Sequence, residues 1–216
     1  MILDDYKIIT IKTGRLSQNC YLIRHNLSED LLLIDPGDDA HQILDIIERE
    51  GSRLKLILLT HAHYDHVGAI KMISDKFQLP FFMHQDDLKL FNRAPTYALA
   101  FEKKNLEISK NYLFFDKEKM VLGGHEISIM HVPGHTPGGV CIQIANFAFS
   151  GDTLLKEFPN HLNLPGENLS ELRVSIEKLL TSLESDAILF PGHGRAWTVE
   201  EASKWWSTNK PITHGF

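Results

Sequence analysis

The chain has 216 residues, of which 43% are hydrophobic and 23% are charged, which is typical of a single globular domain with a substantial core. Its formal net charge of −6 argues against nucleic-acid binding, which usually requires a basic surface. No apolar run approaches the roughly 20 residues of a membrane span, and the N-terminal residues lack the pattern of a signal peptide. Two cysteines, Cys20 and Cys141, lie in apolar runs, where buried free thiols are expected rather than a disulfide. We therefore expect a cytoplasmic protein without a nucleic acid or a membrane as partner.

Short apolar runs separated by turn residues predict strands followed by helices in the first half of the chain. Asp39 and Gln42 have the spacing of a capping box, which predicts that a helix starts there. Residues 85–115 are charged, aromatic and weakly periodic, which predicts one or two helices near the site entrance, either as a lid or as plain surface structure. The predicted elements are strands at 6–12, 20–24 and 31–34, a helix after Asp39, a strand at 54–59, a helix to about 77 and a strand at 80–84.

The second half shows a similar order of elements. Strands are predicted at 126–131, 140–145 and 147–150, a helix at 170–183, a strand at 187–190 and a last helix from Thr198. Asn168 with Glu171, and Thr198 with Glu201, have capping-box spacing. Because 31–37 resembles 147–152 and 56–61 resembles 188–193, the sequence predicts one domain over 1–216 with duplicated halves of about 1–120 and 121–216. A site built from strand ends would then lie between the two halves.

The stretch from Thr60 to Gly68 places three histidines and one aspartate within six positions, directly after the apolar run at 54–59. His61 and His63 point to the same side of an extended chain because side chains alternate. Asp65 and His66 can join them only if the chain turns. Four unpaired polar groups at a strand end would be costly to desolvate, so the stretch predicts metal binding. The four groups suffice to begin one metal site or to serve two.

Three further loops carry residues that fit the same site. His135 lies in a turn stiffened by Pro133, Gly134, Pro137 and Gly138, while Asp152 and His193 each follow a predicted strand. A strand-end aspartate alone is more often a cap or turn residue. Together with the central stretch, however, these loops supply five histidines and two aspartates.

These ordered motifs resemble the metallo-β-lactamase superfamily, and most of all its glyoxalase II-type hydrolases, the hydroxyacylglutathione hydrolases. The motifs that match are Thr60-His-Ala-His-Tyr-Asp-His66, Pro133-Gly-His135, Gly151-Asp152 and Pro191-Gly-His193, and the opening strands with Asp35-Pro36-Gly37 extend the match to most of the chain. The resemblance implies an α/β (α+β) fold, namely a four-layer αββα sandwich of two mixed sheets with helices outside and metals at one edge.

The resemblance also implies a binuclear metal site. The implied ligands are His61, His63 and His135 for one metal and Asp65, His66 and His193 for the other, with Asp152 as the bridge. Asp35 would lie behind the ligands without binding a metal. Two divalent ions are expected, with zinc suited by the imidazole and carboxylate ligands and with iron or manganese able to take the same set.

The leading functional hypothesis is hydrolysis of a small-molecule thioester or related acyl substrate. Two divalent cations would lower the pKa of a shared water and polarise the substrate carbonyl. Asp65, which would orient the hydroxide, and Asp152 are the predicted catalytic residues. Many β-lactamases of this fold carry cysteine or serine where Asp152 stands, so β-lactam hydrolysis is not expected.

Three alternatives remain. A sulfur (persulfide) dioxygenase of a related branch would need one iron on His61, His135 and Asp152. A nuclease of the same superfamily fits the acidic balance poorly. A metal-binding protein without catalysis fits poorly as well, because nothing in the ligand set is degraded.

The substrate-binding residues are less well defined. The chain ends 23 residues after His193, without the C-terminal helical region that usually helps glyoxalase II-type enzymes to hold glutathione. Lys156 and His161 are the candidates for contact with an anionic substrate, although either also fits a solvated surface. A homodimer is an expectation from the tryptophans near the end of the chain, which core packing explains equally well. The histidines treated as structural are His25, His41, His84, His125, His131 and His214.

Overall fold

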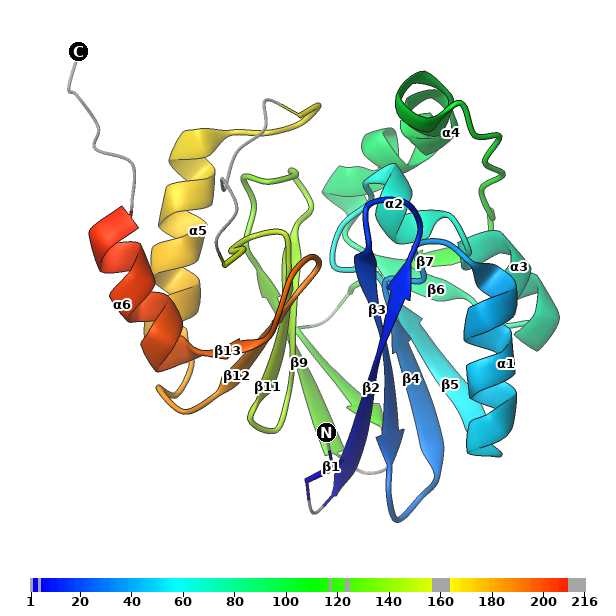
Figure 1. Cartoon of the computed structure of the whole chain (residues 1–216), viewed down its shortest axis with the longest axis horizontal. Coiled ribbons are helices and arrows are strands. Elements are labelled where there is room, and N and C mark those ends of the chain that lie inside the picture. The colour runs from blue at the N-terminus through cyan, green and yellow to red at the C-terminus, as the bar shows by residue number, and fades with distance from the viewer. Residues whose placement is uncertain (1, 4, 117, 123–124, 157–163, 210–216) are drawn as a thin grey trace.

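Two β-sheets pack against each other at the centre of the structure, and helices cover their outer faces (Figure 1). The computed structural model describes residues 2–3, 5–116, 118–122, 125–156 and 164–209. Helices α1 and α3 lie outside one sheet, and α5 and α6 lie outside the other (Figure 1). The predicted four-layer αββα sandwich of two mixed sheets is confirmed.

The first sheet contains seven strands that follow one another in chain order. The first four pair antiparallel, whereas β4 to β7 run parallel, so the carboxyl ends of β4 and β5 lie at the same edge. Its strands are β1 (Ile2–Leu3), β2 (Tyr6–Thr13), β3 (Gln18–His25), β4 (Asp30–Ile34), β5 (Arg53–Leu58), β6 (Phe81–Met83) and β7 (Tyr112–Phe114).

The second sheet contains six strands in the order β13-β12-β11-β10-β9-β8. Only β11 and β12 pair parallel among the described strands of this sheet, which brings their carboxyl ends together. Its strands are β8 (Lys119–Leu122), β9 (His125–His131), β10 (Val140–Ile144), β11 (Phe147–Gly151), β12 (Ile188–Pro191) and β13 (Trp197–Thr198). The chain changes sheet between β7 and β8, close to the predicted border at about residue 120, while the duplication itself stays a prediction.

The helices differ from the predictions mainly around the histidine-rich stretch. The single helix predicted up to residue 77 is divided into a short α2 and a separate α3, so that α2 turns Asp65 and His66 back towards the preceding strand. Residues 85–115 form the 3-10 helix η1, helix α4 and strand β7, and the strand was not predicted. The helical elements are α1 (Ala40–Glu50), α2 (Tyr64–Val67), α3 (Ile70–Phe77), the 3-10 helix η1 (Gln85–Asp87), α4 (Leu88–Glu102), α5 (Leu169–Ser182) and α6 (Val199–Asn209).

Two of the three predicted caps are confirmed. Asn168 accepts hydrogen bonds from the backbone N–H groups of Ser170 and Glu171, and Thr198 and Glu201 form a reciprocal capping box. The capping box at Asp39 is wrong. Asp39 adopts a left-handed conformation with φ of 50°, and its carboxylate accepts a hydrogen bond from the backbone N–H of Gly14 instead.

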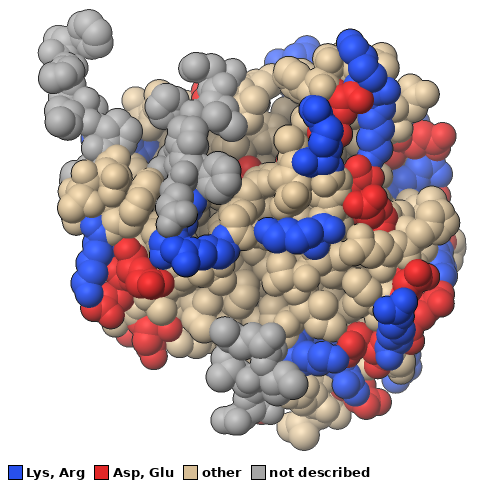
Figure 2. Space-filling model, viewed as in Figure 1, with Lys and Arg blue, Asp and Glu red and all other residues tan. Residues whose placement is uncertain are grey.

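The surface carries mixed charges. On the face seen in Figure 2, lysine and arginine side chains lie apart from one another among acidic and uncharged surface rather than in a continuous basic stripe. None of the helices in the described ranges is long and apolar enough to span a bilayer.

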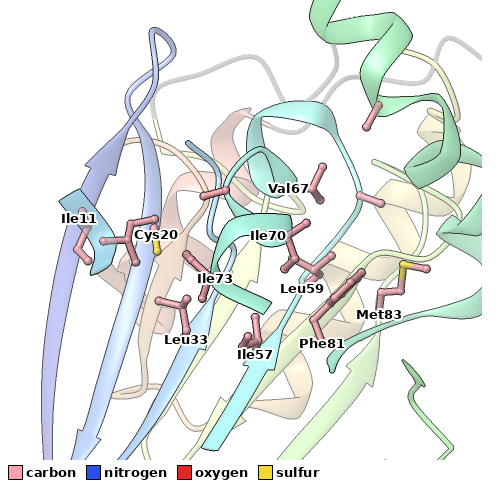
Figure 3. Packing of buried hydrophobic residues seen from close by; sticks show 14 of the residues in the cluster. Ile11, Cys20, Leu33, Ile57, Leu59, Val67, Ile70, Ile73, Phe81 and Met83 are labelled. Atoms are coloured by element: carbon pink, nitrogen blue, oxygen red, sulfur yellow. The ribbon is translucent and has the colours of Figure 1, made fainter. Parts of the chain in front are cut away.

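Three apolar clusters separate the four layers. Strands in the middle of the sheets bury both faces, so Leu31 and Leu33 face the helices while Leu32 and Ile34 face the opposite sheet. Figure 3 shows the cluster beneath α3, where Ile70 and Ile73 pack near Ile57. Trp197 and Trp206 are buried in the third cluster, and Trp205 packs against it, so core packing accounts for these side chains. The homodimer stays a prediction.

Candidate metal centre

The predicted ligand residues all lie at one edge of the two sheets, on loops or on the short helix α2. His61 and His63 follow β5, Asp65 and His66 belong to α2, and His135 lies between β9 and β10. Asp152 follows β11 and His193 follows β12. Backbone hydrogen bonds cross between the sheets from Val140 N to Thr60 O at 2.8 Å and from Asn19 N to Gly192 O at 2.7 Å, and within the second sheet Gly192 N donates to Gly151 O at 2.9 Å. The sheets therefore hold these loops in register.

His61, His63 and His135 form one group of potential ligands. One nitrogen from each ring lies within 4.8 Å of the others, and all three side chains are buried. The closest pair is His135 Nε2 and His63 Nδ1, which are 2.9 Å apart. Three imidazoles converging at this spacing match the ligand set that zinc commonly takes in proteins.

Asp65, His66 and His193 form the second group, with ligand atoms also within 4.8 Å of one another. Asp65 Oδ2 lies 3.1 Å from His193 Nε2 and 3.8 Å from His66 Nε2. This convergence depends on the turn at α2 that the sequence analysis required.

Asp152 lies between the two groups. Its Oδ2 is 3.6 Å from His135 Nε2 in the first group and 3.6 Å from His193 Nε2 in the second, while its Oδ1 is 3.7 Å from His66 Nε2. A carboxylate in this position can share its oxygens between two cations.

Several buried ligand-type atoms of the site lack a hydrogen-bond partner, as expected of atoms that bind a cation. His61 Nε2, His63 Nε2, His66 Nε2 and Asp152 Oδ1 are buried and have no hydrogen-bond partner among the described residues. Each such orphaned atom would cost about 1–3 kcal/mol. Cations in the two groups would give His61 Nε2, His66 Nε2 and Asp152 Oδ1 a partner, and the outer nitrogens of His61 and His66 are held by Thr60 and Asp35. The residues present therefore fit divalent metal ions.

The pKa values of the imidazoles differ between the two groups: they are lowered in the first group and raised in the second. Burial, reinforced by neighbouring imidazoles, lowers the pKa of His61 and His135 well below the ordinary value, so these rings are neutral and present lone pairs. Burial also lowers the pKa of His66, but the carboxylates of Asp152, Asp65 and Asp35 outweigh burial and raise it to about 9. In the metal-free protein, His66 therefore supplies the positive charge that a cation would bring to the second group.

Asp35 lies behind the ligands, as the resemblance implied. Its carboxylate accepts hydrogen bonds from Thr60 N at 2.7 Å and Thr60 Oγ1 at 2.5 Å, and it lies 2.9 Å from His66 Nδ1. Although Asp35 also falls within reach of His61 and His66 as a potential ligand, these bonds already occupy its oxygens. It therefore orients His66 and the start of the histidine-rich loop.

Asp87 is a second supporting carboxylate, which the sequence analysis missed. Asp87 Oδ2 accepts hydrogen bonds from Ala62 N and Thr136 Oγ1, both at 2.9 Å, and Oδ1 accepts one from Gly138 N at 2.7 Å. One buried side chain thus connects the loop of His61 and His63 to the loop of His135. No sequence signal marks it, because Asp87 looks like any acidic residue in the first turn of a helix.

A cavity of about 590 Å³ opens on these ligands. Lys156 is not among the described residues that line it, since its ammonium group lies 5.3 Å from the Trp197 ring centre and 3.9 Å from Glu201. This position accounts for Lys156 without a substrate. His161 lies outside the described residues. The lining residues include the predicted ligands His63, Asp65, Asp152 and His193, together with Lys12, Arg15, Leu16, Ser17, Tyr64, Tyr97, Phe101, Leu155, Leu164, Pro165 and Gly194.

Another histidine cluster lies outside the centre, formed by His84, Asp86 and His131. The two rings stack nearly parallel, with centroids 4.1 Å apart and planes at 11°, so their in-plane lone pairs do not converge on one point. His84 Nδ1 accepts a hydrogen bond from Asp86 N, and His131 Nε2 lies 2.9 Å from Pro137 O. This cluster agrees with the structural role expected for both histidines.

Comparisons with known proteins agree with this geometry. The sequence profile of the Metallo-beta-lactamase superfamily matches residues 13–193. The hydroxyacylglutathione hydrolase GloC of Haemophilus influenzae is 32% identical over 192 residues, which is 87% of this chain and 90% of the relative. The crystal structure of TTHA1623 in a di-iron-bound form is 34% identical, with a TM-score of 0.79 over 91% of this chain and 97% of that one. The crystal structure of the BLEG-1 B3 metallo-beta-lactamase is 26% identical, with a TM-score of 0.84 over 97% of this chain and 100% of that one. The chain belongs to the metallo-β-lactamase superfamily of metal-dependent enzymes, most of which are hydrolases.

Proposed function

We propose that this protein is a binuclear metal-dependent hydrolase that cleaves a thioester or a related acyl substrate, in the manner of hydroxyacylglutathione hydrolases. The observation that carries the proposal is Asp152 between two convergent ligand groups, each containing buried nitrogens without a partner. The similarity to GloC supports the reaction class.

Two metal ions, with zinc as the expected species, complete this proposal. The first would be held by His61, His63 and His135, the second by Asp65, His66 and His193, with Asp152 shared. The di-iron-bound form described for TTHA1623 supports two metal positions and makes iron the alternative to zinc.

Divalent cations bound at these positions would polarise the substrate carbonyl as Lewis acids. They would also lower the pKa of a bound water to near neutrality. The protein side chains organise the rest of the reaction. Asp65 is partly open to the cavity, and the neighbouring His66 and His193 outweigh burial and hold its pKa well below the ordinary value. It is therefore an ionised hydrogen-bond acceptor that can orient the attacking water. Asp152 contributes a second carboxylate to the lining of the same cavity.

The test combines metal content with activity. Protein purified without chelator or affinity tag should contain close to two metals per chain by elemental analysis and should hydrolyse members of a thioester panel. A protein with its full metal complement that is inert towards thioesters, esters and β-lactams would overturn the proposal. One iron per chain, with oxygen uptake on a persulfide, would instead establish the dioxygenase alternative.

A further inference from the structure

The cavity beside the metal centre has a wall of aromatic rings. Phe101 of α4 stacks against Tyr64 of α2 and against Tyr97 of α4, with ring centroids 6.0 Å and 6.2 Å away and planes inclined by 28° and 19°. Phe101 is 53% exposed although it borders a concave site. The three rings line the cavity together with Asp65, Asp152 and His193, and Phe101 presents exposed apolar surface to it.

Further apolar side chains belong to the same cavity. Leu16, from the turn between β2 and β3, is 44% exposed, and Leu155, Leu164 and Pro165 come from the chain between β11 and α5. Binding of an apolar ligand to this exposed apolar surface is favourable, because water is released from both the ligand and the cavity wall. A small hydroxylated acyl group would leave most of this wall in contact with water.

Two cations lie among the lining residues. Lys12 Nζ donates a hydrogen bond of 3.1 Å to Gly194 O, next to His193, and the Arg15 side chain is 71% exposed with Nε 3.8 Å from Glu102. Both come from the β2–β3 hairpin. They are placed to attract an anionic group on a ligand that enters the cavity.

We propose that the substrate of this site is a thioester with a bulky apolar acyl group, either aromatic or medium-chain aliphatic, which packs on Phe101, and with an anionic group on its thiol part, which Lys12 and Arg15 attract. This inference rests on the hydrolase function proposed above. In the reaction, a water oxygen bonds to the acyl carbon, the carbon–sulfur bond breaks, and the thiolate leaves. The products are the carboxylate and the thiol, with release of one proton.

A substrate series tests the acyl group. Acetyl, lactoyl, butyryl, hexanoyl and phenylacetyl thioesters of one thiol, glutathione, should differ in kcat/KM, with a gain of about fourfold for each methylene that becomes buried. Phe101→Ala should lower the ratio of hexanoyl to acetyl kcat/KM about tenfold. Leu99→Ala is the matched control, because Leu99 is 52% exposed on the same helix and does not line the cavity. Lactoyl as the best substrate, or an unchanged ratio in Phe101→Ala, would overturn the inference.

A binding experiment separates this inference from the proposed function. Calorimetry on the metal-loaded protein would compare the binding affinity of phenylacetate with that of lactate. This measurement requires no turnover. Tighter binding of phenylacetate that is lost in Phe101→Ala and kept in Leu99→Ala supports the apolar pocket even if no thioester is cleaved. Equal binding of the two carboxylates, in a protein that does cleave thioesters, would refute the pocket and leave the hydrolase intact.

The cationic part has its own test. Hexanoyl thioesters of glutathione and of uncharged N-acetylcysteamine should differ in KM, and Arg15→Gln together with Lys12→Gln should remove the difference. A KM difference that persists in the double variant would refute the role of these two cations.

Discussion

The carboxylate of Asp87 accepts a 2.9 Å hydrogen bond from the backbone N–H of Ala62, the residue between the predicted ligands His61 and His63. Asp87 also accepts hydrogen bonds from Thr136 Oγ1 and Gly138 N, which follow His135 in its loop. One side chain thus fixes the spacing of three ligands that come from opposite sheets.

Asp87→Ala should weaken metal binding to the group of His61, His63 and His135. Removing a carboxylate that supports ligands typically costs about 10- to 100-fold in metal affinity. Competition with a chromophoric chelator would measure this loss, and the metal-to-protein ratio would fall from the proposed two towards one. Asp86→Asn is the matched control, because the neighbouring Asp86 side chain is half exposed and lies beside His84, outside the two predicted ligand groups. Equal affinity in Asp87→Ala and the control would contradict the role.

Asp35→Asn should affect the other group. The left-handed backbone at Asp35, with φ of 49°, accepts asparagine readily, so the fold should be retained. The amide can no longer satisfy both Thr60 donors and His66 Nδ1, so we expect about 10- to 100-fold weaker binding of the metal held by His66. Loss of metal from both groups alike, or from the group of His61 alone, would argue against this assignment.

These two aspartates show which parts of the site are readable from sequence. The predicted ligand residues are recognisable because they are rare residue types clustered in short motifs at strand ends, and the alternation of strand residues predicts two buried faces. Asp35 follows a strand in such a motif. Asp87 has no such mark, since its partners at Ala62 and Gly138 become neighbours only when the two sheets pack together.

The same reasoning explains the misplaced elements. A 3.6-residue apolar pattern through Val67, Ile70 and Ile73 predicts one helix, yet the chain breaks at Gly68 and Ala69, where the Ala69 N–H donates to Pro36 O instead of to a carbonyl of the preceding turn. The aromatic wall was also not predicted as a cavity. Tyr64, Tyr97 and Phe101 are brought together by the packing of α2 on α4, and their spacing alone fits surface or core equally.

Gly192→Ala should damage the site through Asp152. A Cβ at Gly192 would lie 2.1 Å from Asp152 Oδ1 and 2.6 Å from His66 Cε1, which forces the shared carboxylate to move. We expect loss of most activity with a folded protein, as for Asp152→Ala, which removes the carboxylate altogether. Circular dichroism would verify the fold and elemental analysis the metal content. Full activity in either variant would contradict a shared role for Asp152.

The two cysteines should be inert in the native protein. Burial raises the pKa of Cys141 to about 12 and that of Cys20 well above its ordinary value, and both side chains are fully buried. At pH 8 a thiol reagent that reacts with the thiolate should therefore modify neither residue until denaturant is added, when two thiols per chain should react. Rapid labelling of one thiol in the native state would show that its surroundings open.

Removal of metal should lower the thermal stability of the protein. His61 and His66 each have a buried Nε2 without a hydrogen-bond partner among the described residues, so the metal-free site keeps a desolvation penalty that a cation would relieve. Metal that binds only the folded state stabilises it by about 2.7 kcal/mol at 100 times its Kd, and for a chain of this size that is a rise in Tm of about 5–10 °C. Differential scanning calorimetry with and without added zinc would measure the shift. His193→Asn should reduce it, whereas His84→Asn, in the stacked pair outside the centre, should retain it. If the metal-free protein and the same protein after metal is added back have an identical Tm, these nitrogens are not metal ligands.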